Sequence, residues 1–121
     1  MIEFLAVFIG GGIGSVIRFS ISKALPTPEG GFPFATLTAN ALSCVVLGLA
    51  WMYFSQKTGF SPAVRSLIMV GLCGGFSTFS TFSLETLKLI QVGQLLMAII
   101  YIITSVLICV SILLMIYRIF N

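Results

Sequence analysis

The sequence predicts an all-α membrane protein with four transmembrane helices, the third of them broken within the membrane. Of its 121 residues, 59% are hydrophobic and only 7% are charged, whereas soluble domains carry roughly 25% charged residues. Four apolar stretches each reach the length of about 20 residues that a helix needs to cross a bilayer. The third stretch is interrupted by GGFSTFSTFS, residues 74–83. No basic patch is present, so a nucleic-acid partner is not expected.

The four spans form one transmembrane domain over residues 1–121. They are expected at about residues 4–25, 35–54, 63–90 and 95–117. PTPEGGFP makes a turn after the first span, and SQKTGFSP is a polar connection that ends in a helix-starting proline. Both connections are too short to hold a domain outside the membrane.

The basic residues do not choose an orientation. Four spans place the middle loop and both termini on one side, and the Lys/Arg bias of short loops normally decides which side that is. Here each side receives three basic residues: Lys57, Arg65 and Arg118 against Arg18, Lys23 and Lys88. Either the signal is weak and is overridden during insertion, or the chain inserts in both orientations. Dual insertion would allow an antiparallel homodimer with its two-fold axis in the membrane plane.

Two groups of glycines are expected to bring helices close together. Gly10, Gly11, Gly12 and Gly14 crowd the first span, where small residues allow close helix packing. A phosphate-binding loop is disfavoured there because no strand or Walker lysine accompanies it. In the third span, packing competes with a helix break near Gly74. Such a break frees carbonyls that must be buried, hydrated or bound to a cation.

The hydroxyls and phenylalanines that follow suggest a polar path. Ser and Thr can bond the preceding turn of their own helix, but five in seven residues exceed what that explains. Asn40 adds an uncharged amide, used either in a helix-to-helix hydrogen bond or in the path. Phenylalanine recurs at every third residue, either for packing or to present the positive edges of its rings to an anion. Arg18 either draws anions into a vestibule or extends to the interface.

In these motifs the chain resembles the Fluc (CrcB) fluoride-channel family. GGGIGSVIRF in the first span, TLTANALS in the second and GLCGGFSTFSTFSLE in the third agree with it in order and spacing. The resemblance implies a fluoride-selective channel, not an enzyme, in a bacterial or archaeal cell membrane. It also implies an antiparallel dual-topology homodimer with two pathways and one structural, non-transported Na⁺ on its axis.

The resemblance also suggests roles for individual residues. The carbonyls of Gly74 and Ser77 match the Na⁺ ligands, and Arg18 matches the arginine of the first span. Cys109 falls where a serine often occurs, which puts a polar role there in doubt. The fluoride pathway is expected to be lined by seven residues: Asn40, Phe79, Ser80, Thr81, Phe82, Tyr101 and Ser105.

Two other classes of protein remain to be weighed. A small dual-topology, proton-coupled multidrug exporter shares the size and the four spans, but it should carry a membrane-embedded glutamate in the first span. Glu3 lies at the end of that span, and Glu85 is three residues before Lys88, with which it can pair. A non-transporting assembly protein would explain the small residues but not the concentrated hydroxyls.

Overall fold

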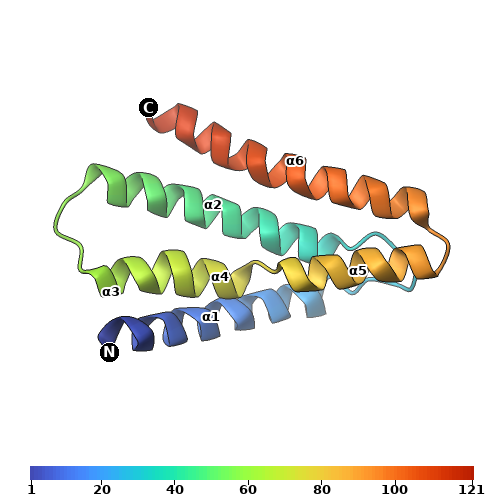
Figure 1. Cartoon of the computed structure of the whole chain (residues 1–121), viewed down its shortest axis with the longest axis horizontal. Coiled ribbons are helices and arrows are strands. Elements are labelled where there is room, and N and C mark those ends of the chain that lie inside the picture. Colours follow the sequence, from blue (N-terminus) through green and yellow to red (C-terminus); the bar gives the residue numbers. More distant parts are fainter.

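The computed structural model describes all 121 residues and contains four helices long and apolar enough to cross a membrane. The first is α1 (Ile2–Ala24), the second α2 (Phe34–Gln56) and the last α6 (Leu95–Phe120). The third, Pro62–Gln91, is a succession of shorter helices (Figure 1). They are α3 (Pro62–Arg65), the π-helical η1 (Ser66–Leu72), α4 (Cys73–Phe76) and α5 (Phe79–Gln91). The prediction of four helices with a broken third is confirmed.

Local sequence signals account for where the helices begin and end. Ser61 caps α3 by accepting a hydrogen bond from the Val64 amide at 3.4 Å, and Pro62 occupies the first turn. Gly93 joins α5 to α6 with a φ of 80°, a conformation that favours glycine. The helix ends lie within three residues of the predicted bounds.

The third segment changes its neighbours at the break. Its first half, η1 and α4, packs against α1, while α5 packs against α6. Helix α2 also packs along α6, and Figure 1 shows it between α6 and the first half of the third segment. The break therefore lies where helices from all four spans come near one another.

Glycines allow α1 to touch the backbone of the third segment. A Cβ atom at Gly10 would overlap the Leu67 carbonyl oxygen, and one at Gly14 would overlap the carbonyl of Leu72. A Cβ atom at Gly75 would overlap the Gly11 carbonyl from the opposite side. The prediction of close helix packing is confirmed at these positions.

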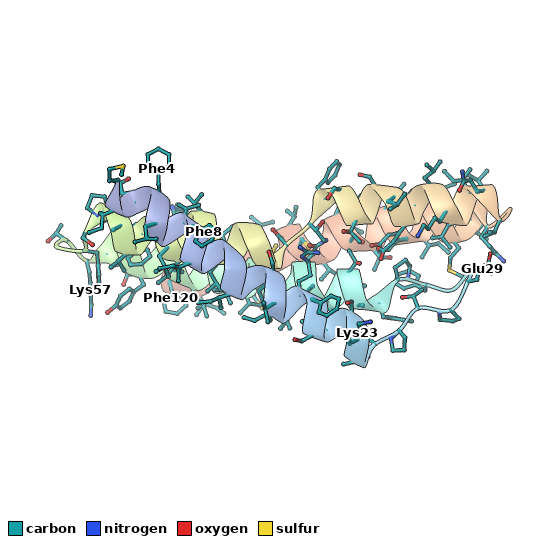
Figure 2. All side chains as sticks on the ribbon, turned by 90° about the horizontal axis from the view of Figure 1, so that it is seen from below. Phe4, Phe8, Lys23, Glu29, Lys57 and Phe120 are labelled. Carbon is teal, nitrogen blue, oxygen red and sulfur yellow. The ribbon has the colours of Figure 1, made fainter.

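Most apolar side chains face outward. Only 20 of the 121 residues are buried, and a small core forms around Leu89, Ala98 and Tyr101. Figure 2 shows Phe4 and Phe8 projecting away from the helices, with Lys57 at one end of the molecule and Glu29 at the other. Apolar flanks between charged ends suit a chain that is surrounded by lipid.

Candidate functional site

The break consists of Ser77 and Thr78, both in extended conformations. Their φ and ψ angles are −79° and 159° for Ser77 and −154° and 116° for Thr78. The break therefore follows the two glycines of the motif, which remain helical in α4, instead of beginning at Gly74. The Thr78 hydroxyl then starts the next helix, because its Oγ1 accepts a hydrogen bond from the Thr81 amide at 3.1 Å.

Side chains from the first two spans satisfy backbone groups that the break releases. The Thr78 amide donates to Asn40 Oδ1 at 2.8 Å, and Asn40 Nδ2 donates to the Thr78 carbonyl at 3.4 Å. Arg18 Nε donates to the carbonyl of Gly75 at 3.1 Å. Next to the break, the Cys73 carbonyl keeps its helical bond from the Ser77 amide at 2.9 Å and also accepts from the hydroxyls of Ser43 and Ser77, at 3.0 and 2.9 Å. These bonds hold the backbone open at a depth where lipid offers no partner.

The carbonyls of Gly74 and Ser77 lose their usual helical partners. In a continuous helix they would accept from the amides of Thr78 and Thr81. Those amides instead bond the Asn40 side chain and the Thr78 hydroxyl. On its side-chain side Gly74 has no atom of another helix within 4 Å. The chain has no group of three or more acidic, His or Cys side chains that could hold a metal. Backbone oxygens are thus the ligands that this region offers to a hard cation.

A pocket of about 330 Å³ opens beside the break. Four of the seven predicted pathway residues line it together: Asn40, Phe79, Phe82 and Ser105. The Ser105 hydroxyl is buried and has no hydrogen-bond partner. The other lining residues are also uncharged: Cys44, Ser77, Thr78, Val106, Cys109 and Val110. The pocket therefore offers amide, hydroxyl, thiol and phenyl groups without a full charge.

Three aromatic rings form a row that leads away from this pocket. The ring centroids of Phe79 and Phe82 are 5.6 Å apart, and those of Phe82 and Tyr101 are 5.0 Å apart. Phe79 is 79% exposed, whereas Tyr101 is completely buried. The row thus runs from the surface of the single chain to the interior between α5 and α6. Tyr101 does not line the pocket itself, but its ring lies next to that of Phe82, which does.

Glu85 lies at the inner end of this row, where sequence reasoning assigned it no role in the path. Its Oε2 accepts a hydrogen bond from the Tyr101 hydroxyl and its Oε1 accepts one from Thr36 Oγ1, both at 2.8 Å. These donors, and not Lys88, satisfy both oxygens of the carboxylate. A carboxylate inside an apolar span is itself a signal for a functional site, but finding Thr36 and Tyr101 as its partners required the fold.

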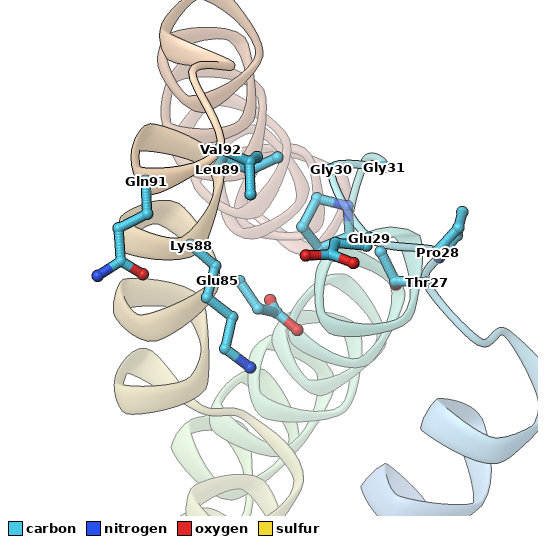
Figure 3. A pocket seen from close by; sticks show the side chains of 11 residues that line it. Thr27, Pro28, Glu29, Gly30, Gly31, Glu85, Lys88, Leu89, Gln91 and Val92 are labelled. Carbon is cyan, nitrogen blue, oxygen red and sulfur yellow. The ribbon is translucent and has the colours of Figure 1, made fainter.

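Two further pockets meet at Glu85. One of about 270 Å³ includes Arg18 and Thr81, and another of about 560 Å³ lies at the end of the molecule. Figure 3 shows Lys88 and Glu85 of α5 projecting into the larger one, opposite Glu29. Arg18 therefore borders a pocket, as a vestibule residue would, while its Nε is bonded at the break.

The remaining predicted residue, Ser80, lies apart from the pocket. It is exposed, and its Oγ is 3.2 Å from the hydroxyl of Thr78. Thr81 also turns from the pocket, and its hydroxyl accepts from Thr78 Oγ1 at 3.1 Å. The structure of a single chain thus groups Asn40, Phe79, Phe82 and Ser105 and leaves Ser80 and Thr81 on a neighbouring surface.

Comparison with known proteins shows the family of this chain. The family model described as "CrcB-like protein, Camphor Resistance (CrcB)" matches residues 5–117. A protein of Serratia proteamaculans named fluoride-specific ion channel FluC is 39% identical over 96 residues, which cover 79% of this chain and 76% of the relative. A protein of Escherichia coli with the same name is 38% identical over 90 residues, covering 74% and 71% of the two chains.

A third relative, named fluoride-specific ion channel FluC 1, comes from Yersinia pestis. It is 38% identical over 91 residues, which cover 75% of this chain and 72% of the relative. The matched region includes the glycines of α1, the broken third segment and the pocket beside it. The chain belongs to the CrcB family, whose curated relatives described here are named fluoride-specific ion channels.

Proposed function

We propose that this protein is a fluoride-selective ion channel that lets the anion leave the cytoplasm passively. The observation that carries the proposal is the uncharged pocket beside the break, which combines Asn40, Ser105, Phe79 and Phe82. The family relationship supports the same function, because the relatives are named as fluoride channels.

An uncharged lining suits rapid conduction of a small anion. Fluoride holds its hydration water strongly, so a pore must replace that water with close donors. The Asn40 amide has a second N–H besides the one that bonds Thr78, and the Ser105 hydroxyl has no protein partner. The edges of the phenyl rings add partial positive charge. A full cation in the pocket would retain the anion, whereas conduction requires binding weak enough for release.

The remaining predicted residues extend the proposed path in both directions. Tyr101 continues the aromatic row inward, and Ser80 and Thr81 provide hydroxyls beside Thr78. Arg18 is proposed to attract anions into the pocket that it borders with Thr81. Its bond to the Gly75 carbonyl gives it a second task, which is to hold the break.

No energy source beyond the membrane potential is required. HF enters cells as a neutral weak acid and dissociates in the more alkaline cytoplasm. An inside-negative potential then favours efflux of the anion by about 2.3 kcal/mol per 100 mV. The protein is proposed to work in this way in the cell membrane of a bacterium or archaeon.

We infer an antiparallel dual-topology homodimer with two pathways along its interface. The equal division of basic residues between the two sides of the membrane supports insertion in both orientations. In the single chain Phe79 and Gly74 are both exposed, and a Cβ atom at Gly74 would meet no other helix. A second chain would cover both. Labels on the two termini, each found accessible from both sides of the membrane, would support this topology, and a single orientation would contradict it.

A structural Na⁺ is proposed on the dimer axis, bound by the carbonyls of Gly74 and Ser77 from both chains. The loss of helical partners at these carbonyls supports the assignment. Replacing Na⁺ by a large organic cation throughout purification should lower dimer stability and fluoride flux, and returning Na⁺ should restore both. Unchanged stability and flux without Na⁺ would contradict the proposal.

Fluoride efflux from liposomes that contain the purified protein is the decisive test. We expect fluoride to leave when a potassium gradient and valinomycin set the potential, and chloride to be retained. Efflux should not depend on a pH gradient, which separates a channel from a proton-coupled exporter. Equal loss of chloride, or no fluoride loss at all, would overturn the proposed function.

A further inference from the structure

Two of the three cysteines line the pocket beside the break, from neighbouring helices. Cys44 belongs to α2 and Cys109 to α6, both are free and partly exposed, and both line the pocket of about 330 Å³. The two helices pack closely one turn further on, because a Cβ atom at Gly48, four residues after Cys44, would lie 3.3 Å from the Cδ2 of Leu113, four residues after Cys109. The proposed function gives neither thiol a task. Cys73 is the third cysteine, and it is buried in α4 outside the pocket lining.

Two thiols on neighbouring helices of one pocket are a suitable site for a soft metal ion. Thiolate sulfur prefers soft ions, and mercury(II) forms linear complexes with two thiolates. When mercuric chloride binds, both thiols lose a proton and both chlorides leave, so that two S–Hg bonds replace two S–H and two Hg–Cl bonds. The bound ion with its two thiolates carries no net charge. A neutral complex avoids most of the cost of placing an ion in an apolar setting.

The same pair is a poor site for zinc. Structural Zn²⁺ takes four ligands in a tetrahedron, and no third acidic, His or Cys side chain joins the two thiols in a metal-binding group. Two thiols complete the coordination of a soft, two-coordinate divalent ion, but they supply only half of the ligands that zinc requires.

We propose that Cys44 and Cys109 form a binding site for a thiophilic, two-coordinate metal ion such as mercury(II), and that the bound ion closes the pocket to anions. The pocket also contains Asn40, Phe82 and Ser105, so an ion held between α2 and α6 would occupy space needed by the permeating anion. Metal binding follows from the thiols alone. The block of transport rests on the proposed function.

Binding is measured on the intact protein in detergent, with mercuric chloride as the probe. Wild type should retain one mercury per chain at this pair after desalting, and the Cys44→Ser, Cys109→Ser double variant should lose that one. Each single variant should bind at least about 10–100-fold more weakly, since that is the loss when even a neighbour of a metal ligand is removed. The matched control, Cys73→Ser, should still bind. Equal retention by wild type and the double variant would overturn the site.

Fluoride efflux from liposomes then tests the block. Mercuric chloride should stop efflux through wild type and Cys73→Ser, a dithiol added afterwards should restore it, and zinc chloride should have no effect. Efflux through the double variant should be insensitive to mercury. Metal binding without any block would overturn the placement of the pair in the path. Absence of efflux before mercury is added would count against the proposed function and leave the binding result intact.

Discussion

The two halves of the third transmembrane segment are built on opposite principles. Before the break, η1 and α4 press their backbone against that of α1 through glycines. After the break, α5 packs against α6 through side chains, among them the rings of Phe82 and Tyr101, and is bordered by pockets. In the first half, Gly71 and Gly75 have no room for an added methyl group where they meet α1, and the second half leaves space for a small ion. The comparison teaches that rigid backbone packing on one side supports an open polar site on the other.

The largest effect is expected where the two halves meet. Asn40→Ala removes the amide that bonds both the N–H and the carbonyl of Thr78. Each unsatisfied buried group costs about 1–3 kcal/mol, so the unfolding temperature in detergent should fall and fluoride efflux should be lost. Leu42→Ala, at an exposed position of the same helix, is the matched control. Wild-type stability of Asn40→Ala would show that the break does not depend on this amide.

The next largest effect is expected in the first half of the third segment, where glycines bring it against α1. Gly10→Ala places a methyl group against the Leu67 carbonyl and the Leu72 amide, so α1 must move away. Overpacking costs about 1–3 kcal/mol, which denaturant unfolding in detergent would detect. At Gly12 a Cβ atom meets nothing within 4 Å, so Gly12→Ala should be neutral or slightly stabilising because alanine favours the helix. Equal losses from both variants would contradict the described packing.

Substitutions in α5, the second half of the third segment, should change fluoride transport more than they change stability. Phe82→Ile keeps an apolar side chain but removes the ring whose centroid is 5.0 Å from that of Tyr101. The Phe82 ring is only partly buried, so the protein should still assemble while fluoride efflux falls. Phe8→Ile changes a 78% exposed ring far from the pocket and should leave efflux unchanged. Unchanged efflux in Phe82→Ile would remove Phe82 from the pathway.

The smallest losses of stability are expected at two serines, Ser43 and Ser83, which each donate one hydrogen bond to a backbone carbonyl. Ser43 donates to the Cys73 carbonyl of another helix, and Ser43→Ala should cost about 0.5–1.5 kcal/mol, the worth of one hydrogen bond. Ser83 is exposed and donates to Phe79 in its own helix, so Ser83→Ala should stay within about 0.5 kcal/mol. Thermal unfolding of both variants checks the order, and a larger loss at Ser83 would reverse the assignment.

The sequence was sufficient for the number of spans because a membrane helix must be apolar over a fixed length. It placed the break at the glycines, three residues early, because Gly74 and Gly75 look like helix breakers when α1 is not in view. Gly75 is in fact required by the Gly11 backbone. The π-helical turns of η1 left no signal, since their hydrophobic spacing does not differ enough from that of an α-helix.

The site was predicted less completely than the fold. Asn40, Phe79, Phe82 and Ser105 were grouped through a family resemblance, and the structure brings them to one pocket. The bonds of Glu85 to Thr36 and Tyr101 join three separate helices. No spacing within one helix reveals such a contact, because it depends on how far each helix is displaced along its neighbours.

The side chains that bond the backbone at the break also have a consequence for the order in which the protein is synthesised and inserted. Arg18 and Asn40, which satisfy the opened backbone, both precede the third segment in the chain. During synthesis the first two helices emerge from the ribosome before Ser77 and Thr78 do. Their donors and acceptors are therefore already in the bilayer when the extended residues arrive. A permuted chain in which the third segment is made first would expose those groups to lipid during insertion, and its yield of inserted protein should be lower.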